Sequence, residues 1–185
     1  MSARSDLFVW MDLEMTGLDP RKHHIVEIAT IITDHQLGVI AEGPEIVIHQ
    51  PEHCLENLDP WVMQTHTESG LFEKIRQSQH SLAAAEAITL EFLEQHVTPA
   101  TAPLCGNSIG TDRGFLQHAM PDVYQHLHYR NIDVSSIKIL YQAWNATRPT
   151  PNKQMRHRAL DDIKESIAEL AFYREHFFIT SRDCA

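Results

Sequence analysis

The sequence has few of the features that mark disulfide-rich, zinc-thiolate or membrane proteins. Its three cysteines, Cys54, Cys105 and Cys184, are odd in number, far apart and form no CxxC pair, so we expect ordinary reduced thiols. No segment approaches the roughly 18 uninterrupted apolar residues of a membrane span. The segment Met1–Asp6 also lacks the charged-then-apolar layout of a signal peptide, so the sequence favours a cytoplasmic protein.

Basic residues are scarce as well. Fifteen Lys and Arg stand against 25 Asp and Glu, which gives a formal net charge of -10 and a pI of about 5.6. Proteins that grip long duplexes release counterions through many Lys and Arg contacts, so double-stranded nucleic acid is not an expected partner. The acidic balance points instead to a short substrate, or to metal ions that bridge the protein to an anionic ligand.

The chain has no internal repeat, low-complexity tract or charge block. With 185 residues and 43% hydrophobic content, it is expected to form one domain over residues 1–185, with a short tail at about 179–185. Apolar, β-branched runs predict strands at Leu7–Glu14, Ile25–Asp34, Glu45–Ile48, Ala102–Gly106 and Ile132–Val134.

Helices are expected in short pieces between Pro60 and Gln77, and over Ser81–Val97, Asp112–Ala119, Ser135–Trp144 and Ala159 to about Phe177. Ser81 is a candidate N-cap. Antiparallel strands followed by strands interleaved with helices predict an α/β fold, a mixed sheet of about five strands flanked by helices.

Two carboxylates stand out on the first strand. Side chains alternate along a strand, so Trp10, Asp12 and Glu14 share one face, opposite Met11 and its neighbours. Two acids side by side at the end of an apolar strand repel each other and lose hydration, unless a cation lies between them. The alternative is that the strand ends early and both acids are solvated.

Further acids and a histidine recur at helix starts. Asp112 follows a Gly-containing turn, and His157 precedes Asp161 and Asp162 at the beginning of the last helix. Each acid could simply cap its helix or interact with the helix dipole.

The ordered combination resembles the DEDDh exonuclease family, and longer motifs are similar to those of its oligoribonuclease members. These motifs occupy Trp10–Leu18, Thr65–Leu71, Gly106–Ile109, Tyr129–Ser135 and His157–Ile167. The resemblance implies an RNase H-like fold and a 3′-to-5′ exoribonuclease acting on very short RNA. It also assigns the metal role to Asp162 rather than Asp161.

The same resemblance implies a two-metal mechanism with Mg²⁺ or Mn²⁺, hard ions that prefer carboxylate oxygens. Asp12, Glu14, Asp112 and Asp162 are the implied ligands. His157 is the implied general base, since an imidazole with a pKa near 6.5 accepts a proton at neutral pH.

For the substrate, the resemblance implies that Leu18 wedges between bases, Trp61 stacks on one and His66 lies near the pocket. Without the motifs, Leu18 would be read as a turn residue and Trp61 as core. The residues implied to close around the 5′ phosphate of a dinucleotide are Ser108, Arg130, Ser135 and Ser136. In this family Tyr129 and Arg130 reach the neighbouring protomer's site, which implies a homodimer, although Tyr129 could equally pack within its own chain.

Three other functions remain as alternatives. The same fold could trim longer RNA or DNA, and a non-catalytic RNA-binding domain could keep the aromatic residues without needing metal. A zinc hydrolase using His126 and His128 is the weakest alternative, because no HExxH pattern or third ligand at helical spacing accompanies that pair.

Overall fold

The fold centres on one mixed sheet. The computed structural model describes residues 6–145 and 158–178. Five strands lie in the order β3-β2-β1-β4-β5, and their bounds are Leu7–Met15 (β1), Ile25–Asp34 (β2), Val39–Val47 (β3), Pro103–Gly106 (β4) and His128–Asp133 (β5). Strands β1, β2 and β3 pair antiparallel, whereas β4 runs parallel to both β1 and β5. The predicted mixed α/β architecture is confirmed.

Helices cover both faces of this sheet. Their bounds are Pro60–Glu68 (α1), Leu71–Gln77 (α2), Leu82–His96 (α3), Gly110–Ala119 (α4), Pro121–His126 (α5), Val134–Trp144 (α6) and Ala159–His176 (α7). A short 3-10 helix occupies Glu52–Cys54. No helix within the described ranges has the length and apolar character to cross a membrane.

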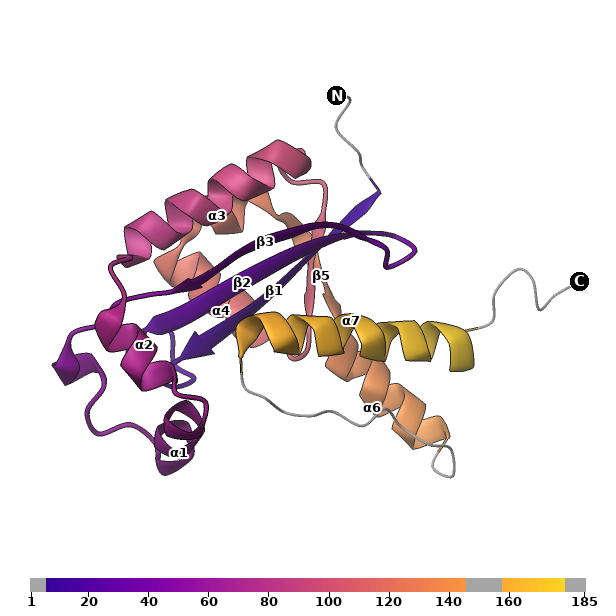
Figure 1. Ribbon diagram of the computed structural model, residues 1–185. Helices are drawn as coiled ribbons and strands as arrows, with labels where there is room; N and C mark the ends of the chain where they lie inside the picture. Colours follow the sequence, from indigo (N-terminus) through magenta and orange to yellow (C-terminus); the bar gives the residue numbers. More distant parts are fainter. Residues whose placement is uncertain (1–5, 146–157, 179–185) are drawn as a thin grey trace, which may run out of the picture.

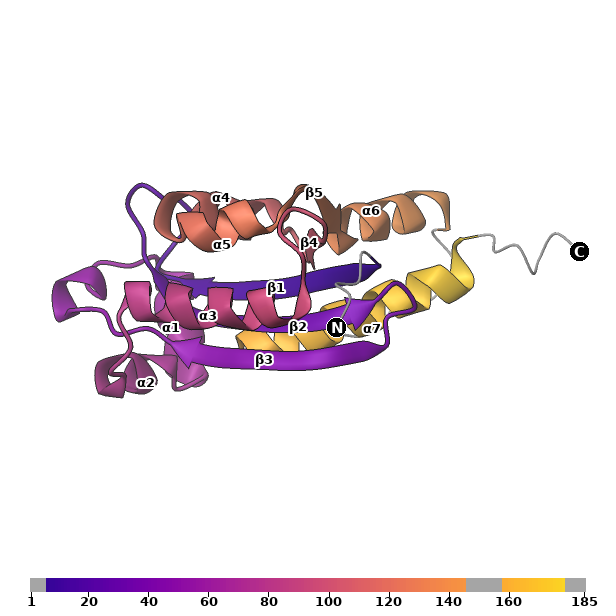
Figure 2. The ribbon, with the colours of Figure 1, turned by 90° about the horizontal axis from the view of Figure 1, so that it is seen from above.

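Alternation along β1 divides the core into two clusters. Val9, Met11 and Leu13 are buried on the face covered by α3, α4 and α5, whereas Trp10 is buried on the face covered by α6 and α7. Figures 1 and 2 show these two helical layers on either side of the strands. Because side chains of a strand point alternately to opposite faces, Asp12 and Glu14 follow Trp10 onto the α7 side.

Apart from the short 3-10 helix, three elements differ most from the expectation. Strand β3 begins at Val39 rather than Glu45, and β5 begins at His128 and ends at Asp133 rather than spanning Ile132–Val134. Both are outer strands of the sheet, where one face or edge meets solvent and an apolar run is not required. Helix α5 was not predicted, because six residues opened by a proline carry too little periodicity.

The cap of α3 provides a stability test. The Ser81 side chain accepts a hydrogen bond of 3.2 Å from the backbone N–H of Ala84, as its sequence position predicted. Ser81→Ala is expected to lower the free energy of unfolding by about 1 kcal/mol, because that N–H loses its acceptor. Urea unfolding measures this loss, and Ser81→Asp, which keeps an acceptor, is the matched control. Equal midpoints for Ser81→Ala and the parent protein would contradict the cap.

Candidate active site

Three carboxylates from two distant segments converge at the end of β1. Asp12 and Glu14 come from that strand, and Asp162 comes from the first turn of α7. One oxygen of each side chain lies within 4.8 Å of the others. Figure 1 shows the end of β1 beside the beginning of α7, with α1 close by. The alternative in which both strand acids are simply solvated does not fit this convergence.

Asp112 approaches the same strand from α4. It is buried in the first turn of that helix, and its Oδ1 accepts a 3.0 Å hydrogen bond from the backbone N–H of Leu13, between the two strand acids. Asp112 does not belong to the three-oxygen cluster found among the described residues. It lies close enough, however, for its charge to act on Asp12.

Burial and mutual repulsion disfavour the charged forms of these acids. The pKa of Asp12 is raised well above its usual value, first by burial and then by the charges of Asp112, Glu14 and Asp162. Burial and the charge of Asp162 raise the pKa of Glu14 to about 8. Burial also raises the pKa of Asp112 to about 7, against the hydrogen bond from Leu13. A cluster this costly to ionise is suited to a divalent cation, which replaces protons and satisfies the oxygens.

Of the two histidines predicted to act in the site, only His66 lies within the described residues. His157 lies outside the described residues. His66, on α1, is buried, and its Nε2 lies 3.0 Å from the carbonyl oxygen of Met15. Because a carbonyl oxygen only accepts, Nε2 carries the hydrogen, and Nδ1 faces Glu14 Oε2 at 3.9 Å. His66 therefore flanks the carboxylates rather than lying at a distance from them.

A buried ion pair, not anticipated from the sequence, holds the beginning of α7. Glu27 on β2 is fully buried and lies directly opposite Glu14 in the β1–β2 ladder. Arg158 donates to it from Nε at 3.1 Å and from a terminal nitrogen at 2.6 Å, and the N–H of Ala159 donates to its Oε2 at 3.2 Å. The same terminal nitrogen of Arg158 also reaches Glu45 on β3. A lone acid in the apolar run of β2 was the only sequence signal for this arrangement.

The serines predicted to bind phosphate gather around Asp133. Its Oδ1 accepts from the N–H groups of Ser108 at 2.9 Å and Ser135 at 3.1 Å, and its Oδ2 accepts from the Ser136 hydroxyl at 2.7 Å. The hydroxyls of Ser108 and Ser135 are 3.1 Å apart. Ser108 has a φ of 50°, a left-handed conformation held by these bonds.

Hydrogen bonds connect this serine cluster to α7. The Ser135 hydroxyl donates to Asn107 Oδ1 at 3.2 Å, and Asn107 Nδ2 donates to the Ser166 hydroxyl at 2.7 Å. Ser166 in turn donates to the backbone carbonyl of Asp162 at 2.8 Å. Side-chain contacts therefore run without a break from the serines to the helical turn that carries a cluster carboxylate.

The predicted base-contacting residues are exposed apolar side chains. Leu18 is 78% exposed and Trp61 is 60% exposed, so the reading of Trp61 as core is wrong. Tyr129 on β5 is 70% exposed, and the guanidinium of Arg130 lies 5.0 Å from its ring centre. Tyr129 is therefore not packed into the core of its own chain.

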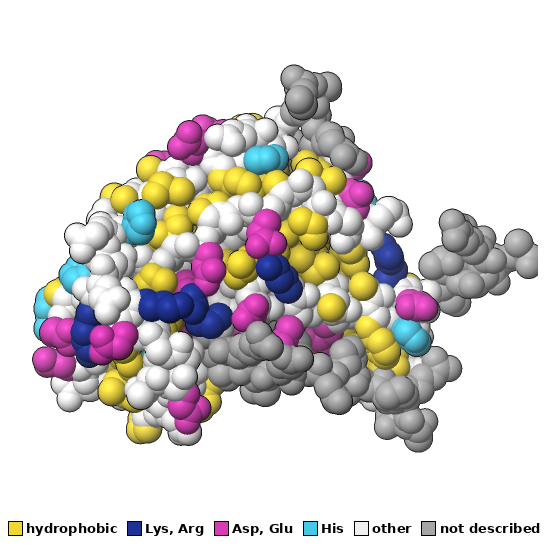
Figure 3. Space-filling model, viewed as in Figure 1, with side chains coloured by type: hydrophobic (Ala, Val, Ile, Leu, Met, Phe, Trp, Pro, Cys, Tyr) yellow, Lys and Arg dark blue, Asp and Glu magenta, His cyan; other side chains and the backbone are white. Residues whose placement is uncertain are grey.

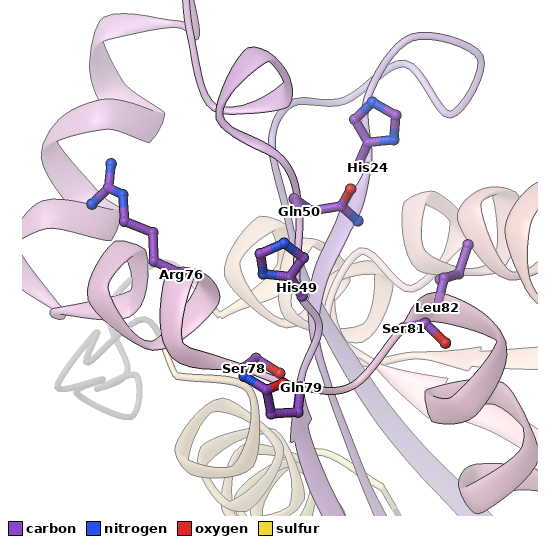
Figure 4. A pocket seen from close by; sticks show the side chains of 8 residues that line it. All are labelled: His24, His49, Gln50, Arg76, Ser78, Gln79, Ser81 and Leu82. Carbon is purple, nitrogen blue, oxygen red and sulfur yellow. The ribbon is translucent and has the colours of Figure 1, made fainter.

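His126, His128 and the cavity beside α3 lie apart from the carboxylates. His126 Nε2 bonds to the carbonyl oxygen of Val97 at 3.0 Å, and the backbone N–H of Arg130 donates to His128 Nδ1, which leaves the zinc alternative without support. A cavity of about 400 Å³ lies near the beginning of α3 (Figure 4). Its lining includes His24, His49 and Arg76 but none of the clustered acids.

Comparison with known proteins agrees with this geometry. Residues 9–170 match the family model described as Exonuclease. The chain is 52% identical to the oligoribonuclease of Idiomarina loihiensis, covering 92% of this chain and 93% of that protein. It is 49% identical to the oligoribonuclease of Escherichia coli strain K12, covering 96% and 98% respectively.

Solved structures share the fold at low identity. Exonuclease I of E. coli, in complex with an oligonucleotide, superposes with a TM-score of 0.72 and 15% identity over 94% of this chain. Exonuclease I of Methylocaldum szegediense gives 0.70 and 17% over 92% of it. The matched region spans only 42% and 41% of those longer chains. The solved structures and this chain share an RNase H-like fold. The family model and the sequence relatives show that this chain belongs to the exonuclease family and, within it, to the oligoribonucleases.

Proposed function

We propose that this protein hydrolyses very short RNA from the 3′ end, with 5′-phosphorylated dinucleotides as preferred substrates and nucleoside 5′-monophosphates as products. The observation that carries the proposal is the convergence of Asp12, Glu14 and Asp162 from segments about 150 positions apart in the sequence. Relatives that match nearly the whole chain are named oligoribonucleases, which supports the substrate class.

The site would hold two divalent ions, Mg²⁺ or Mn²⁺, through Asp12, Glu14, Asp112 and Asp162. When bound, such ions offset the charge that develops on the phosphodiester oxygens as water attacks and the ribose oxygen leaves. The chain's own acid–base group is His157, which accepts the proton of the attacking water. The raised pKa values of Glu14 and Asp112 support cation binding, because burial, and for Glu14 also neighbouring negative charge, disfavours the anions in the absence of a cation.

Substrate contacts would come from both ends of the site. Leu18 and Trp61 offer exposed apolar surfaces for bases, and His66, on the same helix as Trp61, lies 3.9 Å from Glu14. Ser108, Ser135 and Ser136 supply hydroxyls for the 5′ phosphate, and Arg130 supplies charge. Figure 3 shows acidic and basic side chains interspersed over one face rather than gathered in a basic stripe, which suits a short substrate.

The protein would act as a homodimer in which Tyr129 and Arg130 reach the partner's site. Both residues are exposed on β5, one of the two outer strands of the sheet. We also propose that residues 1–185 act as one exonuclease domain in the cytoplasm. The free thiols of Cys54 and Cys105 are consistent with a reducing compartment.

Product analysis with a 5′-phosphorylated dinucleotide tests the proposal. With Mn²⁺ present, we expect conversion to mononucleotides, and a kcat/KM higher than that for RNA or DNA of about ten nucleotides. Faster cleavage of the longer chains would favour a general 3′-end trimming exonuclease. Binding without hydrolysis in the presence of Mn²⁺ would favour a non-catalytic RNA-binding domain.

Arg130 is predicted to recognise the 5′ phosphate. Arg130→Ala should lower kcat/KM for a phosphorylated dinucleotide by about 10- to 100-fold, since a charge-assisted hydrogen bond contributes roughly 1.5–3 kcal/mol. The same dinucleotide without its 5′ phosphate is the control substrate, and its kcat/KM should change little. An equal loss on both substrates would remove Arg130 from phosphate recognition.

A further inference from the structure

A fully buried glutamate lies beside the carboxylate cluster but outside it. Glu27 is 0% exposed and stands opposite Glu14 in the antiparallel ladder, where two like charges normally destabilise the pair. Its charge is one of the causes that raise the pKa of Asp12 and of Glu14. The cluster of oxygens suited to a cation, as found among the described residues, does not include Glu27.

Both oxygens of Glu27 are directed to the beginning of α7. Oε1 accepts from Arg158 Nε and a terminal nitrogen, while Oε2 accepts from Arg158 Nε and the N–H of Ala159. The backbone carbonyl of Arg158 accepts from the N–H of Asp162 at 2.9 Å. Glu27 therefore holds the residue whose carbonyl closes the first helical turn, and that turn carries Asp162.

Stability alone is a poor explanation for this arrangement. A buried ion pair often contributes little net stability, because desolvating both charges offsets their attraction. Here the pair also places an additional anion beside acids that already repel one another. The contacts do, however, fix the start of a helix relative to β2, and β2 is paired with β1 along its whole length.

We propose that Glu27 is a positioning residue, which by its reach to Arg158 and Ala159 sets the first turn of α7 so that Asp162 meets Asp12 and Glu14. Arg158 acts as its counter-charge, and the same guanidinium also donates to Glu45 on the next strand. The inference rests on the proposed metal site. Residues that orient metal ligands without touching the metal commonly change metal affinity or activity about 10- to 100-fold when altered.

Two variants separate reach from charge. Glu27→Asp keeps the negative charge but shortens the side chain by one methylene, so it no longer spans to Ala159. The double variant Glu27→Gln/Arg158→Gln leaves the local net charge unchanged and keeps side chains long enough to hydrogen-bond. If reach positions Asp162, Glu27→Asp weakens Mn²⁺ binding 10- to 100-fold, and the double variant stays within about threefold of the parent protein.

The primary measurement is titration calorimetry of the metal-free protein with Mn²⁺ alone, and the second is kcat and KM on a dinucleotide. We expect kcat to fall with Mn²⁺ affinity in Glu27→Asp while KM changes less. Leu93→Ala, buried in the cluster on the other face, is the control for lost stability and should keep its Mn²⁺ affinity. Parent-like Mn²⁺ binding in Glu27→Asp, or an equal loss in the double variant, overturns the inference.

Two further outcomes are distinguishable. If the parent protein itself binds no Mn²⁺, the proposed function fails, and the inference fails with it. If Glu27→Asp does not fold, Glu27→Ala/Arg158→Ala replaces it, because this double variant removes the reach to Ala159 without leaving either charge of the pair alone. A loss of Mn²⁺ affinity of about tenfold or more is expected, and parent-like affinity overturns the inference.

Discussion

Asp12→Asn is expected to lower metal-dependent hydrolysis by about 10³-fold or more, because a carboxylate of the cluster loses its charge and an oxygen ligand. The fold should remain, since the amide has nearly the same volume and replaces an acid whose charged form is disfavoured by burial and by neighbouring charges. Initial rates on a dinucleotide, measured beside Mn²⁺ titration calorimetry, test both parts. Turnover within tenfold of the parent value would exclude Asp12 from the metal site.

Two control variants separate the role of the proposed base from that of the proposed metal ligands. His157→Ala should slow turnover by about 10²- to 10⁴-fold and leave Mn²⁺ affinity intact, because it removes a base and not a ligand. Asp161→Asn changes the neighbour of Asp162 on the same helical turn. It should lower Mn²⁺ affinity by less than about threefold. If Asp161→Asn rather than Asp162→Asn abolishes Mn²⁺ binding, the assignment by motif spacing is wrong.

The metal-free protein is expected to become less stable as pH rises from about 4 to about 8. Burial and the charges of neighbouring acids raise the pKa of Glu14 from 4.5 to about 8, and burial raises that of Asp112 from 3.8 to about 7. Within that window the folded state holds protons that the unfolded chain has released, so raising the pH favours unfolding. The loss should be on the order of a few kcal/mol, or roughly 5–15 °C in Tm.

Mn²⁺ should reverse this loss, because it binds the ionised cluster and displaces its protons. Calorimetric Tm values at pH 5.5 and pH 8, with and without Mn²⁺, provide the measurement. Stabilisation by Mn²⁺ is expected to be larger at pH 8. Asp12→Asn, which removes one of the mutually repelling acids, should flatten the metal-free profile. A metal-free Tm that rises between these pH values in the parent protein but not in the variant would contradict the predicted fall of stability with rising pH.

The parts of the fold predicted from the sequence are those with clear periodicity. Strand β2 has the predicted bounds, and α3 begins after the predicted cap at Ser81, because apolar spacing and a side-chain cap are local signals. The beginnings of β3 and β5 were misplaced because exposed residues of outer strands, such as Val39 and Tyr129, need not follow an apolar pattern.

The candidate site was predictable where its residues lie in ordered motifs. Asp12 and Glu14 share a face by strand alternation, but their meeting with Asp162 came from family resemblance and not from spacing. The partners of Glu27 could not be predicted from the sequence, because Arg158 lies 131 positions away and the contact depends on how α7 docks against β2. Long-range pairing of this kind is fixed by tertiary packing, for which a single sequence carries no local signal.

The hydrogen-bonded chain from Ser108 to the carbonyl of Asp162 has a mechanical consequence. Its links through Ser135, Asn107 and Ser166 are short side-chain contacts of 2.7 to 3.2 Å, not a pliable loop. These links therefore hold the serines at a fixed distance from the helical turn that carries the Asp162 carboxylate. For the proposed substrate, the protein would gauge how many nucleotides fit between its two ends, and selectivity for length would come from rigidity without any reading of base identity.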